Sequence, residues 1–170
     1  MASIIRSTDS VFIKDSALSS PLPDDVSADL AGVLQVLLVD LINMSLQTKQ
    51  MHWCLTGAEF PTLHAKLDEI TDLARGAYDT LAERCVQLAV APNGTPMAVA
   101  QSGLEQVQPG FVDGQTVLSF LSMMLMTMAQ KVRGAIQATG SRDLLTQDLL
   151  FKIGEDLEKQ HWMINAQIAS

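Results

Sequence analysis

The sequence predicts an all-α protein, a bundle of four long helices with one long connection between the second and the third. Along four segments, apolar residues recur every three or four positions, which is the period of an amphipathic helix. Between Pro92 and Gly114 the composition shifts to Pro, Gly, Gln and small residues, which indicates an irregular crossover. No segment predicts a strand, and the chain carries no internal repeat.

The first long helix is expected to begin within residues 24–27, where Asp and Ser side chains can cap it. Gly57 is expected to end it, since glycine is the residue that most often terminates a helix. Its last turns carry Lys49, His52 and Trp53.

Proline and glycine positions bound the other helices. Pro61 stands at an early position that a helix tolerates, Pro92 stops the second helix, and Gly140 can close the third. One long crossover between the second and third helices is the connectivity of a ferritin-like bundle. We expect long helices at about 61–91, 115–138 and 142–169, with a short helix at about 97–102 in the crossover.

The chain divides into a tail and one domain. Residues 1–24 are rich in Ser and show no sustained period, so we expect a tail or extended arm there. Residues 25–170 are expected to form the helical domain.

Several observations predict a cytoplasmic protein with no membrane partner. Residues 1–20 lack the basic start and apolar stretch of a secretory signal. The longest apolar stretch, residues 33–46, is interrupted by polar residues and is too short for a membrane span. Cys54 and Cys85 are too few for a disulfide framework, which favours a reducing compartment.

Composition and charge narrow the choice of partners. Of the 170 residues, 48% are hydrophobic and 18% are charged, and the mean hydropathy of +0.20 is apolar for a soluble chain, which suggests surface buried between subunits. The net charge is −8 and the pI about 4.6. Phosphate binding needs clusters of Lys and Arg, so this balance argues against a general nucleic-acid partner and favours cations.

Four residues of the second helix have metal-ligand spacing. His64 and Asp68 are four residues apart, as are Asp79 and Glu83, so each pair shares a helix face. Asp68 and Asp79 lie about three turns apart, so both pairs share one stripe, yet they are separated by roughly 16 Å along the axis. Metal ligands lie within about 2.0–2.6 Å of the ion, so one copy of the helix cannot close a site.

Two copies of the second helix, packed antiparallel about a two-fold axis, remove this difficulty. The His64 end of one copy then faces the Glu83 end of the other, and each dimer holds two equivalent sites. The axis would pass near Leu73, where Asp72 and Arg75 could pair across it.

The end of the first helix would complete the site. His52 joins beside His64, and this mixed nitrogen and oxygen ligand set suits Fe(II), Mn(II) or Zn(II). Lys49 lies one turn earlier on the same face. Its cation would compete with a second metal, so we expect one tight and one weak iron position per site.

Three alternatives compete with this interpretation. A single pair such as His64 and Asp68 is usually part of a solvated or salt-bridged helix face. A metal site is favoured here because both pairs lie on the same stripe of the helix and because the region holds two of the three histidines in the chain. Glu158 and His161 form a Glu-x-x-His motif, but single-chain di-iron sites need a second copy of it. Methionines in the third helix could bind a soft metal, although core filling is the favoured interpretation. They are Met123, Met124, Met126 and Met128.

The block from Lys49 to Arg84 and parts of the last helix carry a specific pattern. Its residues are Lys49-Gln50-Met51-His52-Trp53, Gly57, Phe60, Leu63-His64, Leu67-Asp68-Glu69, Asp79-Thr80-Leu81-Ala82-Glu83-Arg84, Asp148-Leu149-Leu150, Leu157-Glu158-Lys159 and Trp162. This pattern resembles the signature of the Dps family, the ferritin-like mini-ferritins of bacteria, over about residues 26–168.

The resemblance implies a hollow twelve-subunit shell built from two-fold dimers, with ferroxidase centres at the dimer interfaces. It implies that one subunit supplies His52, His64 and Asp68, and that its neighbour supplies Asp79 and Glu83. Such shells oxidise Fe(II), usually preferring hydrogen peroxide to oxygen, and store ferric mineral inside. Trp53, beside the site, could quench stray radicals, and Lys49 would belong to the same centre.

The chain departs from the DNA-binding members of this family. Their tails are rich in lysine, whereas this tail has Arg6 and Lys14 as its only basic residues. The C-terminal end of the sequence, at Ser170, carries no basic extension either, so direct DNA binding is not predicted. The favoured function is a ferroxidase and iron-storage shell. A nucleoid-binding structural protein is the main alternative, and a bundle without catalysis is a third. Asp143 and Asp148 are candidates for an acidic pore, or equally for carboxylates placed at a helix N-terminus.

Overall fold

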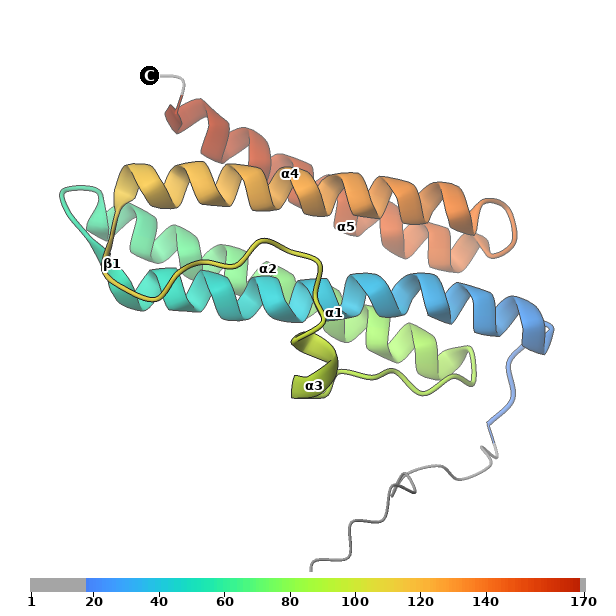
Figure 1. Cartoon of the computed structure of the whole chain (residues 1–170). Coiled ribbons are helices and arrows are strands. Elements are labelled where there is room, and N and C mark those ends of the chain that lie inside the picture. Colours follow the sequence, from blue (N-terminus) through green and yellow to red (C-terminus); the bar gives the residue numbers. More distant parts are fainter. Residues whose placement is uncertain (1–17, 169–170) are drawn as a thin grey trace, which may run out of the picture.

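The computed structural model describes residues 18–168, and these form a four-helix bundle (Figure 1). The long helices are α1 (Asp24–Cys54), α2 (Phe60–Gln87), α4 (Gly114–Thr139) and α5 (Leu144–Ile168). The short helix α3 (Pro96–Val99) lies in the crossover between α2 and α4. The predicted ferritin-like bundle, with a long crossover that contains a short helix, is confirmed. Most of the expected tail, residues 1–17, lies outside the described residues.

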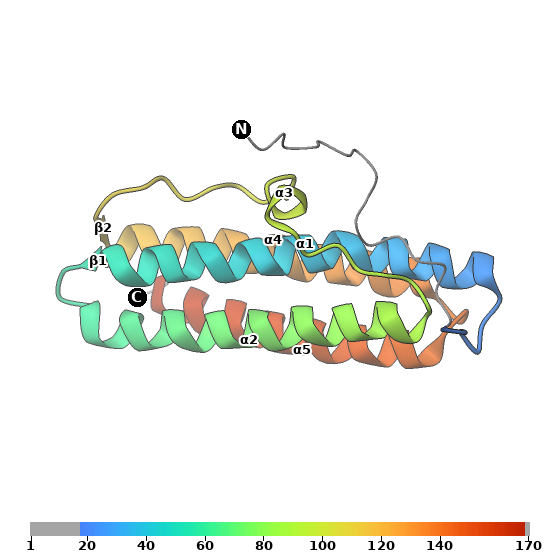
Figure 2. The same cartoon turned by 90° about the horizontal axis from the view of Figure 1, so that it is seen from below.

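The four long helices pack as two pairs, α1 with α2 and α4 with α5, with their axes nearly aligned (Figures 1 and 2). The core between them is built from leucines at the helical period, which bury apolar area from all four helices at once. Fully buried examples are Leu30, Leu41, Leu67, Leu81, Leu121, Leu125, Leu150 and Leu157.

The core prediction for the methionine cluster of α4 is half right. Met124 and Met128 are buried, whereas Met123 and Met126 are 39% and 41% exposed. The reason is helical phase, since residues two apart cannot share one face. No soft-metal site needs to be invoked for the buried pair, which fills core space.

The helix ends deviate from the expected positions by a few residues. α1 ends at Cys54 and the chain turns extended at Leu55, so Gly57, with φ of +108°, lies in the following turn. α2 ends at Gln87 rather than just before Pro92, and Ala89 adopts a φ of +60°. α4 is capped by Asp113, whose side chain accepts a hydrogen bond from the Thr116 amide at 2.9 Å.

Two short strands were not predicted. β1 (Leu55–Thr56) pairs in parallel with β2 (Val112–Asp113), with Leu55 opposite Val112. A strand of two residues has no room to show apolar and polar alternation, so the sequence carries no signal for it. The pairing fixes the end of the crossover against the turn that joins α1 to α2.

A buried carboxylate of α1 fixes the middle of the crossover. Asp40 is 1% exposed and accepts hydrogen bonds from Ser102 Oγ at 2.7 Å and Gly103 N at 3.1 Å. Its other oxygen pairs with Lys131 Nζ of α4 at 2.6 Å. The charge is therefore compensated, which a buried carboxylate requires.

Two glutamines of α1 hold the crossover on either side of Asp40. Gln35 exchanges two hydrogen bonds with the backbone of Asn93, both of 2.8 Å. Gln47 Oε1 accepts from Val107 N at 2.6 Å. The crossover is thus fastened along the length of α1, which Figure 2 shows running beneath it.

Candidate metal centre

Two histidines meet where α1 ends and α2 begins. The rings of His52 and His64 are stacked, with centroids 3.6 Å apart and planes inclined by 25°. His52 Nδ1 lies 3.0 Å from the carbonyl oxygen of His64, and His64 Nδ1 lies 3.1 Å from that of His52. Sequence spacing predicted that the rings are neighbours, but not this reciprocal contact.

The reciprocal contact assigns the tautomer of both rings. A backbone carbonyl can only accept, so each Nδ1 must carry the proton and donate it. In the neutral ring Nε2 then keeps its lone pair, which is the form of imidazole that binds a metal. A second partner that fixes ring and tautomer in this way is a regular feature of metal-ligating histidines.

Phe60 completes the stack; the sequence analysis named it within the family pattern but gave it no role. Its ring lies 4.7 Å from that of His64, inclined by 28°. The two residues are four apart on α2, a spacing at which helical side chains touch, so the contact could have been anticipated. Phe60 is 41% exposed and covers one face of the histidine pair.

Asp68 lies beside the histidines and is held by Lys49. Lys49 Nζ donates to Asp68 Oδ1 at 2.6 Å, and His52 Nδ1 lies 3.3 Å from the same oxygen. The hydrogen bond from Lys49 is the main cause that lowers the pKa of Asp68, with His52 and His64 adding to it. The carboxylate is therefore ionised and partly neutralised by an ammonium group at the position where we expected the weaker metal.

Asp79 and Glu83 do not join this cluster within one protomer. Both are exposed on α2, about three and four turns from Asp68. Among residues 18–168, no three His, Cys, Asp or Glu side chains gather closely enough to hold a metal ion. Trp53 is 67% exposed and directly follows His52.

The expected pairing of Asp72 with Arg75 across a two-fold axis stays a prediction. Within the protomer these residues contact each other, Arg75 Nη1 lying 3.4 Å from Asp72 Oδ1. Both side chains are more than half exposed. An ion pair between exposed groups is weak, so it leaves them free to change partners.

The competing Glu-x-x-His motif is not part of a metal site in this protomer. Glu158 accepts two hydrogen bonds from Arg133, of 2.5 and 2.9 Å. His161 Nε2 accepts from Asn165 Nδ2 at 2.9 Å. Glu158 therefore joins α5 to α4 through Arg133, and His161 contacts Asn165 within α5 and lies 3.5 Å from Ser122 Oγ of α4.

The structure places Asp143 at the N-terminus of α5, which is the second of the two roles expected for it. It is 8% exposed, and its carboxylate pairs with Arg84 Nη2 at 2.5 Å. It also accepts from the amides of Leu145 and Thr146, which makes it the N-terminal cap of α5. The alternative interpretation, a carboxylate at a helix N-terminus, is the correct one for Asp143. Asp148 is exposed, and its role in a pore stays a prediction.

Comparison with known proteins identifies the class. A family described as a ferritin-like domain matches residues 32–170. The chain therefore belongs to the ferritin-like proteins.

Individual relatives narrow this to one family. The DNA protection during starvation protein of Mycolicibacterium smegmatis is 31% identical over 88% of this chain and 82% of its own. A structure of Mycobacterium smegmatis Dps superposes with a TM-score of 0.86 at 29% identity, covering 91% of this chain and 90% of the other. The chain belongs to the Dps family, which confirms the resemblance.

Two further matches are a structure described by its metal chemistry and a relative with a different name. A Dps structure from Vibrio cholerae, described as a member of a broad superfamily of ferritin-like diiron-carboxylate proteins, has a TM-score of 0.83 at 26% identity, covering 90% and 99% of the two chains. The fine tangled pili major subunit of Haemophilus ducreyi is 30% identical over 82% of this chain and 74% of its own. No helix within residues 18–168 is long and apolar enough to cross a membrane.

Proposed function

We propose that this protein is a ferroxidase and iron-storage protein, whose oxidation sites form between two copies of α2. The observation that carries the proposal is the histidine pair, in which both Nε2 lone pairs are left free by reciprocal Nδ1 hydrogen bonds. With Asp68 beside them, they offer half of a nitrogen and oxygen ligand set suited to Fe(II). The relatives described as ferritin-like and diiron-carboxylate proteins support iron as the substrate.

The second half of the site would come from Asp79 and Glu83 of a partner copy packed antiparallel. Both carboxylates are exposed, and neither forms an ion pair within the part of the chain that the structure describes. Both therefore remain available to bind a metal held by a partner copy. Twelve copies would enclose a cavity for ferric mineral, as expected from the family. Sedimentation analysis of the native protein, with and without Fe(II), should therefore give a dodecamer; a stable monomer would contradict the shared site.

The expected reaction uses hydrogen peroxide. Two Fe(II) ions each give up one electron, the O–O bond breaks, and two protons complete two water molecules. Because both electrons are delivered together, no hydroxyl radical is released. Trp53, beside His52 and exposed, is placed to be oxidised by any radical that escapes.

Stoichiometry tests this reaction. We expect anaerobic addition of peroxide to consume two Fe(II) per peroxide, with no hydroxyl-radical adduct in a spin-trapping measurement. One Fe(II) per peroxide, accompanied by the adduct, would show ordinary single-electron chemistry and would refute the ferroxidase assignment. Repeating the titration with oxygen alone shows which oxidant reacts faster.

Lys49 is expected to cause the difference in Fe(II) affinity between the tight and the weak iron position. Replacing Lys49 by Met removes the ammonium group 2.6 Å from Asp68 and frees that carboxylate. Anaerobic calorimetry should then show a second tight Fe(II) equivalent per site, because a cation no longer competes with the metal. Lys152→Met, an exposed lysine of α5, is the matched control and should keep the wild-type stoichiometry.

The alternative function, DNA compaction, is suggested by the names of the relatives, which are DNA protection during starvation proteins. The net charge of −8 opposes it, since phosphate contacts need cations. A gel-shift assay at low salt decides. Strong retardation of duplex DNA by the purified assembly would favour the structural role over our proposal.

A further inference from the structure

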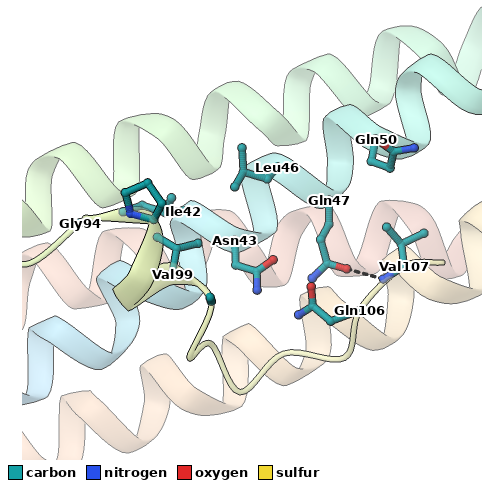
Figure 3. Close-up of a pocket in the computed structure, with 11 residues that line it drawn as sticks. Ile42, Asn43, Leu46, Gln47, Gln50, Gly94, Val99, Gln106 and Val107 are labelled. Atoms are coloured by element: carbon teal, nitrogen blue, oxygen red, sulfur yellow. Dashed lines mark hydrogen bonds between the residues drawn. The ribbon is translucent and has the colours of Figure 1, made fainter. Parts of the chain in front are cut away.

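A pocket of about 500 Å³ lies between α1, α3 and the crossover, away from the candidate metal centre (Figure 3). Its walls combine apolar side chains, among them Ile42, Leu46 and Val99, with several carboxamides. This size and mixture are typical of sites for small organic molecules. None of the residues that line it is charged.

Gln47 presents an unpaired donor to this pocket. It is 4% exposed, and its Oε1 accepts from Val107 N at 2.6 Å. Because that amide can only donate, the carbonyl end must face it, and Nε2 is directed the other way. Within residues 18–168 this Nε2 is buried and has no hydrogen-bond partner.

Asn43 adds a second carboxamide, one helical turn before Gln47. It is 6% exposed, and its side chain makes no hydrogen bond in the described part of the chain. Figure 3 shows the side chains of Asn43, Gln47 and Gln106 pointing toward the same space. A buried amide donor without a partner costs about 1–3 kcal/mol, so Gln47 Nε2 calls for a compensating contact.

We propose that this pocket binds an uncharged small molecule that combines a carboxamide-like hydrogen-bonding group with an apolar body. The ligand's carbonyl oxygen would accept from Gln47 Nε2, and its N–H group would donate to Asn43 Oδ1. The apolar body would lie on Ile42, Leu46 and Val99. Carboxylates are disfavoured, because no cation lines the pocket to offset their desolvation.

Octanamide is a suitable probe, tested by calorimetry on the native assembly of the full chain. We expect it to bind, and to bind about tenfold more tightly than octanoate, which has the same chain but a charge. Two variants should weaken its binding by about tenfold or more, Asn43→Leu by removing an amide and Ala100→Phe by filling the pocket. Gln130→Leu, which removes an exposed amide of α4, should bind as the wild type does.

The variants are chosen to keep the fold. Asn43→Leu breaks no hydrogen bond of the protein, and Ala100 is exposed, so at least one of them should assemble normally by native mass. The proposal is overturned if the native wild-type assembly does not bind octanamide. This result would also follow if a neighbouring subunit of the assembly occupied the pocket. The proposal is equally overturned if an assembled Asn43→Leu or Ala100→Phe shell binds octanamide as tightly as the wild type. Neither result depends on Fe(II) oxidation, so the inference can fail while the proposed function stands.

Discussion

Shells made wholly of His52→Ala subunits, and shells made wholly of Asp79→Ala subunits, are each expected to lose peroxide-dependent Fe(II) oxidation. Each variant removes one half of the proposed site, either the imidazole supplied by α1 or the carboxylate supplied by the partner's α2. The rate should fall to that of Fe(II) in buffer, measured by absorbance of the ferric product. Native mass should be unchanged, since Asp79 is exposed and His52 lies at the end of its helix.

Mixing the two inactive variants gives the sharper test. When they are unfolded and reassembled together, a mixed dimer holds one site with both substitutions and one site with neither. Random pairing should therefore restore about a quarter of the wild-type activity, a consequence of two-fold symmetry. A site formed within one chain would give no recovery, and that outcome would disprove the shared centre.

Matched mixtures control this experiment. His52→Ala mixed with His64→Ala should stay inactive, because both substitutions strike the same half of the site and every site in every dimer lacks one histidine. Recovery in this second mixture would point to refolding artefacts rather than complementation.

The second large effect is expected at the ion pair between Arg84 and Asp143. Both side chains are 8% exposed, and Arg84 also donates from Nε to Thr146 Oγ1 at 2.9 Å. Asp143→Ala would leave a buried guanidinium unpaired and remove the cap of α5, which should lower the free energy of unfolding by about 3–5 kcal/mol. Thermal melting at one fixed protein concentration measures the loss.

The pH dependence of this effect has a defined sign. Burial raises the pKa of Asp143, but the hydrogen bonds from Thr146 and Arg84 outweigh it, and the net shift is downward from the ordinary value of 3.8. A carboxyl with a lowered folded-state pKa stabilises the protein above the unfolded value and loses that contribution as pH falls through the folded one. The gap in stability between wild type and Asp143→Ala should therefore be full near neutrality and shrink below about pH 3.8.

An exposed ion pair provides the control. Arg133→Ala removes the ion pair with Glu158, in which the two side chains are 66% and 43% exposed, and should cost less than about 1 kcal/mol. Equal losses for Arg133→Ala and Asp143→Ala would contradict the importance given to burial.

Local periodicity was enough to predict the bundle, because each long helix buries a stripe of leucines that the sequence displays directly. Helical spacing also placed His64 and Asp68 on one face of α2, whereas the role of His52, His64 and Asp68 as metal ligands stays a prediction. The contact between Arg84 and Asp143 did not follow from helical spacing, since it joins residues 59 apart in sequence through tertiary packing. For the same reason the sequence left Asp143 open between an acidic pore and a helix N-terminus, although its spacing to Thr146 is that of a helix cap.

The crossover illustrates the other limit of sequence reasoning. Its Pro and Gly content indicated an irregular connection. No local sequence pattern predicted that the side chains of Gln35, Asp40 and Gln47 of α1 would each accept a hydrogen bond from it. Asp40 and Gln47, seven residues apart, lie on nearly the same side of α1, whereas Gln35, five residues before Asp40, is turned about 140° from it.

These fastenings give the crossover the character of a strap rather than a loose connection. Backbone amides of Asn93, Gly103 and Val107 donate to side chains of α1, so they exchange with solvent only when the strap lifts from the helix. Lifting at Gly103 would break the hydrogen bonds from Ser102 and Gly103 to the Asp40 carboxylate, which makes opening of this part alone costly. We therefore expect these three amides to show slow deuterium uptake, comparable to that of the helices, in a segment that has almost no regular structure of its own.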